Sequence, residues 1–550
     1  MRMTDVFLVS PPYGSSYGKG SRRQKHGLPP LGLASINAYV KSKGYSTRFI
    51  DLAFCDLSDE DVAQIVKREQ PRAVGITAVT TQIIPAVRLA QCIKRAAPRV
   101  LTVLGGPHPA ALPELSIQYP GVDLVVAGEG ELAMVEILEG RDYQDILGLC
   151  WIEDGVIRRN PQREPLAPLD EAPAPDYEGL EIESYRHIFE LTGPAMPVMS
   201  GRGCPFRCNF CASDVVTNER TSRYLSPARF VDHIEDLYHR YGVRDFVFTD
   251  ETFVLKSSRI FEICDEILSR GLKFSWVCQT RVNGIDPQVV TAMKRAGCKV
   301  MAVGIESGDP HILETIGKGI KKDRVTKSCD IISRSGILLE GFFILGLPHD
   351  TPETVQRTID FALELPLDYA QFSMFIPLPG TPGFKMAVEG EVLRFYANDW
   401  DDFSRYTYPL VESDALSRLQ LKRLHSAALR SFYFRPRMIY RSIRGVTSIA
   451  KFRLLLTMAR DFTQILLAKR TPKRKIPMER VVPTDLLRLN GALNDTELNQ
   501  LGSIASTRRN TDGQSQTARL PIVASACQGT PPRQPAGDAL LSLPVLGTGV

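Results

Sequence analysis

Residues 201–211 read Gly-Arg-Gly-Cys-Pro-Phe-Arg-Cys-Asn-Phe-Cys, with thiols at Cys204, Cys208 and Cys211. Three thiolates on one loop can each bind one iron of a cubane cluster, which leaves the fourth iron open to another ligand. A zinc site would need a fourth Cys or His close by, and the next one after Cys211 is His233. Three unrelated core cysteines are another alternative, but the flanking Arg and Asn make the loop polar. We predict an iron–sulfur site in which Cys204, Cys208 and Cys211 are the metal ligands and catalytic residues.

Apolar runs alternate with helical patterns around this loop. Six such runs fall at residues 197–200, 245–249, 274–279, 299–304, 340–345 and 369–376. Strands that alternate with helices indicate a parallel sheet, and six repeats are fewer than the eight of a closed barrel. We therefore expect an open, partial (β/α)6 barrel over residues 191–385, with the cysteines directly after its first strand.

A second alternating series precedes the barrel. Its apolar runs fall at residues 6–10, 46–51, 73–79, 100–106 and 122–128. This pattern predicts a doubly wound, Rossmann-like α/β domain over residues 1–145, whose ligands would bind at the carboxyl edge of the sheet. Asp154-Gly155 indicates a hairpin, and five prolines between Pro161 and Pro175 indicate a stiff connector. We assign both to a linker over residues 146–190.

The chain becomes helical and basic after about residue 385. Between Arg430 and Lys475 there are thirteen Lys or Arg and a single acid, Asp461, so this segment carries a net charge of +12 against +5 for the whole chain. A basic segment with interleaved apolar residues favours contact with an anionic membrane surface, and a solvated helical cap on the barrel is an equal alternative. We expect a basic helical region over residues 386–488 and a mostly disordered tail over residues 489–550.

Composition excludes several classes of protein. The 550 residues are 43% hydrophobic and 23% charged, which is typical of globular domains and not of disordered or collagen-like chains. The small net charge argues against a nucleic-acid binder. Eleven cysteines do not form a dense, even disulfide pattern, which favours a reducing cytosol. We found no secretory signal and no apolar run long enough to span a membrane, and we expect a cytoplasmic protein, with peripheral contact at the inner face of the membrane through residues 430–475 as the open alternative.

The three-cysteine motif after the first strand of a partial barrel resembles the radical S-adenosylmethionine (SAM) superfamily over about residues 195–385. The resemblance implies a 4Fe-4S cluster whose open iron chelates SAM, and an electron donor of the flavodoxin or ferredoxin type. It also implies SAM contacts from Glu251, Arg281 and Glu306, each at the end of an expected strand; surface ion pairs are the alternative for these three. Cleavage of SAM would give methionine and a 5′-deoxyadenosyl radical.

The N-terminal domain resembles the cobalamin (B12)-binding domain that precedes the barrel in one subclass of that superfamily. The motifs that carry the resemblance are Pro11-Pro12, Leu28–Gly32, Gly75–Thr77, Gly105–His108 and Gly128–Glu131. It implies cobalamin contacts from Pro11, Pro12, Thr77, Gly105, Gly106, His108, Gly128 and Glu129.

The family's Asp-x-His-x-x-Gly motif, whose His ligates cobalt, is absent from this domain. Asp309-Pro310-His311 is the chain's one Asp-x-His, and it is followed by Glu314 rather than Gly. We therefore expect cobalamin without a His lower ligand, with His108 as a capping or backbone-bonded residue.

Together the two resemblances imply a cobalamin-dependent radical SAM enzyme that methylates an unactivated carbon of a hydrophobic or natural-product substrate. The 5′-deoxyadenosyl radical would remove a hydrogen, and methylcobalamin would give the methyl group. The sheet's carboxyl edge should then face the barrel mouth. One alternative is a cyclase or rearrangement enzyme, because Phe432–Pro436 resembles part of relatives that act on hopanoids and on magnesium-protoporphyrin monomethyl ester. A non-catalytic iron–sulfur and corrinoid module is the other.

Overall fold

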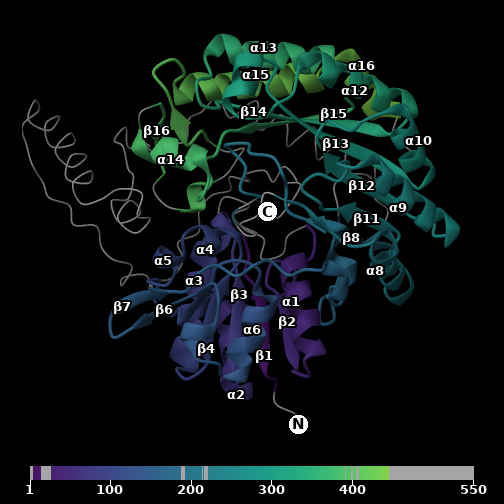
Figure 1. Ribbon diagram of the computed structural model, residues 1–550. Helices are drawn as coiled ribbons and strands as arrows, with labels where there is room; N and C mark the ends of the chain where they lie inside the picture. Colours follow the sequence, from purple (N-terminus) through teal and green to yellow (C-terminus); the bar gives the residue numbers. More distant parts are fainter. Residues whose placement is uncertain are drawn as a thin grey trace, which may run out of the picture.

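The computed structural model describes residues 4–13, 27–186, 193–213, 215, 221–390, 392–397, 400–403 and 408–444. An N-terminal α/β unit, built on a seven-stranded sheet, lies against a curved six-stranded sheet with helices on its outer face (Figure 1). The α/β fold class expected from the sequence is confirmed. Residues 445–488 of the expected basic region and the expected tail, 489–550, lie outside the described residues.

Seven strands form the N-terminal sheet in the order β2-β1-β3-β4-β5-β6-β7. The first five are parallel; they are β1 (Val6–Ser10), β2 (Thr47–Asp51), β3 (Ala73–Thr77), β4 (Leu101–Gly105) and β5 (Leu124–Val126). The helices are α1 (Leu31–Ser42), α2 (Asp59–Glu69), α3 (Ile83–Ala96), α4 (Pro107–Ala111), α5 (Pro113–Ser116) and α6 (Gly130–Glu139). Every residue of β1 is buried, as expected for a parallel strand that is covered on both faces.

The hairpin of β6 (Leu149–Glu153) and β7 (Val156–Arg159) continues this sheet. β6 pairs antiparallel with β5, and β7 pairs antiparallel with β6. Asp154 and Gly155 have φ values of 50° and 76° at the turn, as the Asp-Gly signal predicts. The sequence placed this hairpin in the linker, whereas in the structure it belongs to the N-terminal sheet.

Six parallel strands form the second sheet in the order β15-β14-β13-β12-β11-β8. They are β8 (Ala195–Val198), β11 (Asp245–Phe248), β12 (Ser275–Thr280), β13 (Cys298–Glu306), β14 (Leu338–Leu345) and β15 (Tyr369–Met374). The helices between them are α8 (Pro227–Arg240), α9 (Ser257–Ser269), α10 (Pro287–Arg295), α11 (Pro310–Thr315), α12 (Lys322–Ser335) and α13 (Pro352–Glu364). β8 and β15 are the two edges of this sheet, so the partial barrel is open, as expected.

Local sequence explains the outer helices. Ser226 caps α8 by accepting a hydrogen bond from the backbone N–H of Arg229, and Pro227 follows in the first turn. Phe230, Ile234 and other residues at helical spacing are buried on one face of α8. This face packs on the outer side of the curved sheet, where the ring of Phe230 lies 5.1 Å from the ring of Phe248.

The chain after the barrel is only partly helical. Its helices are α14 (Pro382–Glu389), α15 (Arg418–Tyr433) and α16 (Pro436–Arg444). Between α14 and α15 lie β16 (Arg394–Phe395), the 3-10 turn η6 (Trp400–Asp402) and β17 (Val411–Glu412), where we expected helix. The η6 turn packs on the N-terminal domain, because Trp400 donates a hydrogen bond of 3.0 Å to the Tyr119 hydroxyl. Such contacts between distant segments leave no helical period in the sequence.

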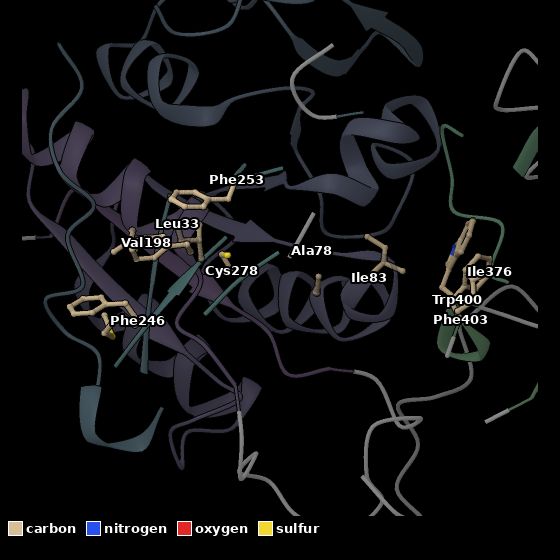
Figure 2. Packing of buried hydrophobic residues seen from close by; sticks show 14 of the residues in the cluster. Leu33, Ala78, Ile83, Val198, Phe246, Phe253, Cys278, Ile376, Trp400 and Phe403 are labelled. Atoms are coloured by element: carbon tan, nitrogen blue, oxygen red, sulfur yellow. The ribbon is translucent and has the colours of Figure 1, made fainter. Parts of the chain in front are cut away.

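A single cluster of buried apolar side chains extends through both sheets and the η6 turn. Figure 2 shows part of it, with Leu33, Ala78 and Ile83 from the N-terminal domain, Val198, Phe246, Phe253 and Cys278 from the barrel, and Ile376, Trp400 and Phe403 from later segments. Because burial of apolar surface drives association, the two domains share a core and are not joined by the linker alone. Over the described residues, each helix is too short or too polar to cross a membrane.

Candidate functional site

The three candidate cluster cysteines lie on a loop that two short strands close at its base. β9 (Gly201–Arg202) pairs antiparallel with β10 (Arg223–Tyr224). Gly203 has a φ of +88°, and a Cβ at this position would lie 2.3 Å from the carbonyl oxygen of Thr221. Only glycine fits such a position. Gly203 therefore fixes the direction in which the chain enters the loop just before Cys204.

The three thiols are close enough to influence one another. Burial raises the pKa of the Cys211 thiol, and the neighbouring Cys208 and Cys204 raise it further. Over the described residues, no three Cys, His, Asp or Glu side chains converge on a single metal ion. A cubane cluster does not need such convergence, because each thiolate binds a different iron. A donor set of three thiols without a fourth ligand fits a 4Fe-4S cluster with an open iron better than it fits zinc.

Glu251 brings a free carboxyl oxygen to this loop. It follows β11, and its carboxyl accepts a hydrogen bond from the backbone N–H of Gly203, while Oε2 has no partner among the described residues. Burial raises the pKa of Glu251 to about 7. The preceding residue, Asp250, is held by the N–H and hydroxyl of Ser200 at 3.0 and 2.5 Å. A buried carboxyl with an unpaired oxygen fits the ammonium group of SAM.

Arg281, which follows β12, contacts the cluster loop itself. Its Nη1 donates a hydrogen bond of 3.2 Å to Sγ of Cys208, and its Nη2 donates to the carbonyl oxygen of Lys318. The guanidinium carbon lies 3.8 Å from the centre of the Phe206 ring. We expected this side chain to bind SAM, and the structure places it against Cys208, one of the three predicted cluster ligands. These contacts fix the Arg281 guanidinium between the Phe206 ring and the Cys208 sulfur.

Glu306 ends β13 with a φ of +68°, a conformation that is unusual for a residue other than glycine. Its Oε1 lies 2.7 Å from Nζ of Lys318, and both side chains are buried. A Cβ at Gly304 would lie 2.7 Å from each of these two atoms. A side chain at position 304 would therefore collide with the Glu306–Lys318 pair, and glycine leaves room for the pair. The sequence pointed to Glu306 but missed Lys318, for which the flanking glycines Gly317 and Gly319 were the available signal.

The residues expected to hold cobalamin follow the parallel strands of the N-terminal sheet. Pro11 and Pro12 follow β1, Thr77 ends β3, Gly105 ends β4 and Gly106 follows it, and Gly128 and Glu129 follow β5. Because these strands are parallel, all of these residues lie at one carboxyl edge. Gly106 has a φ of +95°, and a Cβ there would lie 2.7 Å from the Thr77 hydroxyl. Glycine at position 106 therefore lets the end of β4 pack closely against the chain just after β3. Neither Gly105 nor Gly106 places a side chain at this edge, where a large flat ligand would bind.

His108 lies beneath the η6 turn. Its ring packs edge-on against Trp400, with 4.6 Å between the ring centres, and its Nδ1 lies 3.4 Å from the Thr80 hydroxyl. Burial lowers the pKa of His108 to about 3, so the imidazole is neutral. Its Nε2 is buried and has no partner among the described residues. The contact with Thr80 is to a side chain, whereas we expected a capping or backbone-bonded histidine.

Glu129 makes contacts that the sequence did not predict. Its carboxylate pairs with Arg202 at 3.0 Å and with Arg223 at 2.7 Å, and it accepts a hydrogen bond of 2.8 Å from the N–H of Leu166. Burial opposes its ionisation, but the two guanidinium groups lower the pKa of Glu129 below its ordinary value. The structure therefore assigns this carboxylate to the junction with the cluster loop. Its position next to Gly128 had suggested a contact with cobalamin.

Comparisons with known proteins agree with this division of the chain. Residues 24–138 match the B12 binding domain, and residues 198–362 match the radical SAM superfamily. The chain is 35% identical over 449 residues to the uncharacterized methyltransferase PH0819 of Pyrococcus horikoshii, which covers 80% of this chain and 95% of that protein. It is 30% identical over 430 residues to the anaerobic magnesium-protoporphyrin IX monomethyl ester cyclase of Rubrivivax gelatinosus, which covers 76% of this chain and 75% of the cyclase.

A solved structure shares the fold over nearly the whole chain. The cobalamin-dependent SAM radical enzyme OxsB, solved with aqua-cobalamin and SAM bound, superposes with a TM-score of 0.67 at 15% identity. The superposition covers 94% of this chain and 82% of OxsB. Both the N-terminal sheet and the open barrel therefore have counterparts in one experimental structure.

Proposed function

Because the chain belongs to the radical SAM enzymes that carry an N-terminal B12-binding domain, we propose that it methylates an unactivated carbon of a hydrophobic or natural-product substrate. Its cofactors are a 4Fe-4S cluster, SAM and cobalamin. When bound, the cluster supplies the electron that cleaves SAM to a 5′-deoxyadenosyl radical, and cobalamin supplies a cobalt-bound methyl group. Support for methylation comes from the relative in P. horikoshii, which is named a methyltransferase.

The observation that carries this proposal is a contact between the carboxyl edge of the N-terminal sheet and the base of the loop that carries the three cysteines. Glu129 at the carboxyl edge of the N-terminal sheet contacts Arg202, two residues before the first cluster cysteine, Cys204. The carboxyl edge of this sheet therefore faces the loop of the three cysteines, which supports a reaction in which both cofactors act on one substrate. Methylation of an unactivated carbon needs both reactive groups next to the same substrate atom, because positioning supplies much of the rate enhancement.

The chain's own residues have distinct roles in this proposal. Cys204, Cys208 and Cys211 hold the cluster, and Glu251 holds the ammonium group of SAM. Arg281 donates a hydrogen bond to the Cys208 sulfur and so positions it. The buried Glu306–Lys318 pair and the glycine at 304 shape the barrel wall, and Gly105 and Gly106 admit cobalamin at the facing edge.

Cyclisation without methyl transfer is the second candidate, favoured by the likeness to the cyclase of R. gelatinosus. Labelled SAM separates the two. The reduced protein is incubated with methyl-labelled SAM and an extract of a strain that lacks the gene, and new products are sought by mass spectrometry. Label in a product supports methylation, and an unlabelled, ring-closed product supports cyclisation. The Cys208→Ala variant is the control, and intact SAM cleavage in this variant would exclude both reactions.

The finer choice of partners is also a proposal. Radical SAM enzymes take small-molecule substrates and an external electron donor, and we propose a flavodoxin or ferredoxin as the donor in the cytosol. We further propose peripheral membrane contact through the basic region, of which residues 430–444 are described. Phe434, Ile439 and Tyr440 are 50%, 44% and 64% exposed there, and this segment contains five arginines and no acid. Exposed apolar side chains among arginines support contact with an anionic surface.

A further inference from the structure

Four charged side chains connect the N-terminal domain to the base of the cluster loop. Glu129 and Glu131 lie at the end of β5 and the start of α6, and Arg202 and Arg223 lie on β9 and β10. We call these four residues the interdomain latch. All four side chains are largely buried, with exposed fractions between 7% for Glu131 and 21% for Arg202. Such burial distinguishes the latch from ordinary surface ion pairs.

The latch has a definite geometry. Arg202 uses Nη1 for Glu129 at 3.0 Å and Nη2 for Glu131 at 2.8 Å, so its guanidinium spans both carboxylates. Arg223 uses Nη2 for Glu129 at 2.7 Å and donates from Nη1 to the carbonyl oxygen of Leu166 in the linker. Two guanidinium and two carboxylate groups balance in charge, and forked contacts of this kind restrict orientation as well as distance.

The latch acts on the cluster loop at both of its ends. Arg202 and Arg223 are opposite each other in the β9–β10 pair, and two like charges so placed repel each other unless carboxylates lie between them. Glu129 provides such a carboxylate for both. Gly203, next to Arg202, also donates its N–H to Glu251. One carboxylate of the N-terminal domain thus connects to the loop that carries Cys204 and to the acid beside it.

We propose that Glu129, Glu131, Arg202 and Arg223 are positioning residues that set the separation between the cobalamin site and the cluster. The buried apolar cluster that spans both domains holds them together, but apolar contact is non-directional. The ion pairs of the interdomain latch are directional, and they therefore set how the two domains are oriented relative to each other. The inference rests on the proposed function for its catalytic consequence, but its structural content concerns only the placement of the two cofactor sites.

The test uses Glu129→Gln and Glu131→Gln in the full chain loaded with cobalamin and a 4Fe-4S cluster. Both cofactors can be made paramagnetic by reduction, and relaxation of the cob(II)alamin signal by the reduced cluster reports their separation in electron paramagnetic resonance. We expect one defined separation in the parent and a broader, longer distribution in both variants. Product formed per SAM cleaved is the activity readout, because this ratio corrects for any change in the cluster loop itself, and loss of positioning should lower it by up to about 10²-fold in both variants.

The matched control is Glu136→Gln. Glu136 lies on α6, as Glu131 does, and has the same 10% exposed fraction as Glu129. It pairs with Arg141 and Arg163, neither of which belongs to the barrel. This variant loses a buried ion pair but should keep the parent separation. A second readout needs no cofactor: small-angle scattering of the cofactor-free protein should show a larger radius of gyration for Glu129→Gln than for Glu136→Gln.

The outcomes separate this inference from the proposed function. An unchanged separation and unchanged scattering in both latch variants would overturn the positioning role. A changed separation in a protein that transfers no methyl group to any product would leave the latch in place and refute methylation. If Glu136→Gln changed the separation as much as Glu129→Gln, the effect would come from loss of any buried ion pair, and the latch would have no special role.

Discussion

Glu340 is a buried carboxyl group on the inner side of the barrel. Phe248 faces the outer helix α8, so its neighbour Val247 faces inward, in a cluster with Val300 and Leu338. Glu340 lies two residues after Leu338 on β14 and shares its side of the sheet. Oε2 of Glu340 has no partner among the described residues, and burial raises its pKa from 4.5 to about 8. We predict that Glu340→Gln stabilises the protein, increasingly so as the pH rises.

The sign and size follow from proton linkage. The pKa of Glu340 is higher in the folded than in the unfolded protein, so its protonated form contributes stability that is fully present below about pH 4.5 and is lost as the pH rises through about 8. At about 1.36 kcal/mol per pH unit, the parent loses about 3 kcal/mol at pH 7 and approaches a loss of about 5 kcal/mol above pH 9. Glutamine keeps the shape of the protonated acid but does not titrate. The variant should therefore gain less than about 1 kcal/mol at pH 5 and about 3 kcal/mol at pH 7.

Urea unfolding followed by tryptophan fluorescence at pH 5, 7 and 9 measures this difference. Trp276 lies within the barrel and stacks on Phe248 at 4.4 Å, so its emission reports on the same domain. The control is Glu183→Gln, because the Glu183 side chain is 79% exposed and should give no change that depends on pH. An equal gain in stability at all three pH values for Glu340→Gln would refute the reasoning, because it would show that the carboxyl is not forced to ionise in a buried site.

Three further predictions concern the cluster loop, SAM and the membrane. Gly203→Ala should bind much less iron than the parent after anaerobic reconstitution, because the positive φ alone costs about 1–2 kcal/mol and the new Cβ would lie 2.3 Å from a carbonyl oxygen. The control Gly242→Ala also has a positive φ, +65°, but open space around the new Cβ, and it should keep its iron. Equal iron in both variants would contradict the assignment of the cluster loop. Glu251→Gln should weaken SAM binding to the cluster-loaded protein by about 10-fold to 100-fold in calorimetry, the range for a hydrogen bond to a charged group, and parent affinity would remove Glu251 from the SAM site. The full chain should float with anionic vesicles at low salt and less so at high salt. Tyr440→Ser should reduce this flotation. Failure of the parent protein to float at low salt would refute the proposed membrane contact.

The strands of both domains could be predicted because their signal is local. β1 begins and ends where its apolar run does, and all six barrel strands overlap their expected runs. A strand that is buried on both faces of a parallel sheet needs apolar residues at consecutive positions, and such a run can be seen directly in the sequence. The same holds for the cluster loop, whose three cysteines need a fixed spacing. A function that depends on residues close together in the chain can therefore be recognised in the sequence itself.

Residues that act across the fold were harder to find. Lys318 lies 12 residues after its partner Glu306, and Arg202 and Arg223 lie 73 and 94 residues from Glu129. A lysine or arginine in a polar loop is compatible with a solvated surface, so the sequence alone does not distinguish a buried partner from an exposed charge. The η6 turn was not predicted for a similar reason, and the sequence indicated helix there. Trp400 is held in place by His108 and Tyr119, which lie far away in the chain.

The junction of the two domains shows why such distant pairs matter for this chemistry. Apolar burial can hold two domains together in several neighbouring arrangements, since it depends on area and not on direction. A guanidinium that contacts two carboxylates allows few orientations of the two domains. If the domains shift, a buried charge loses its partner at a cost of about 3–5 kcal/mol. Arg202 combines such a fork with a place in the sequence beside the cluster cysteines. In the proposed reaction two cofactors must act on one carbon atom. The ion pairs of Arg202, on the strand that leads into the cluster loop, therefore fix the geometry that this reaction needs.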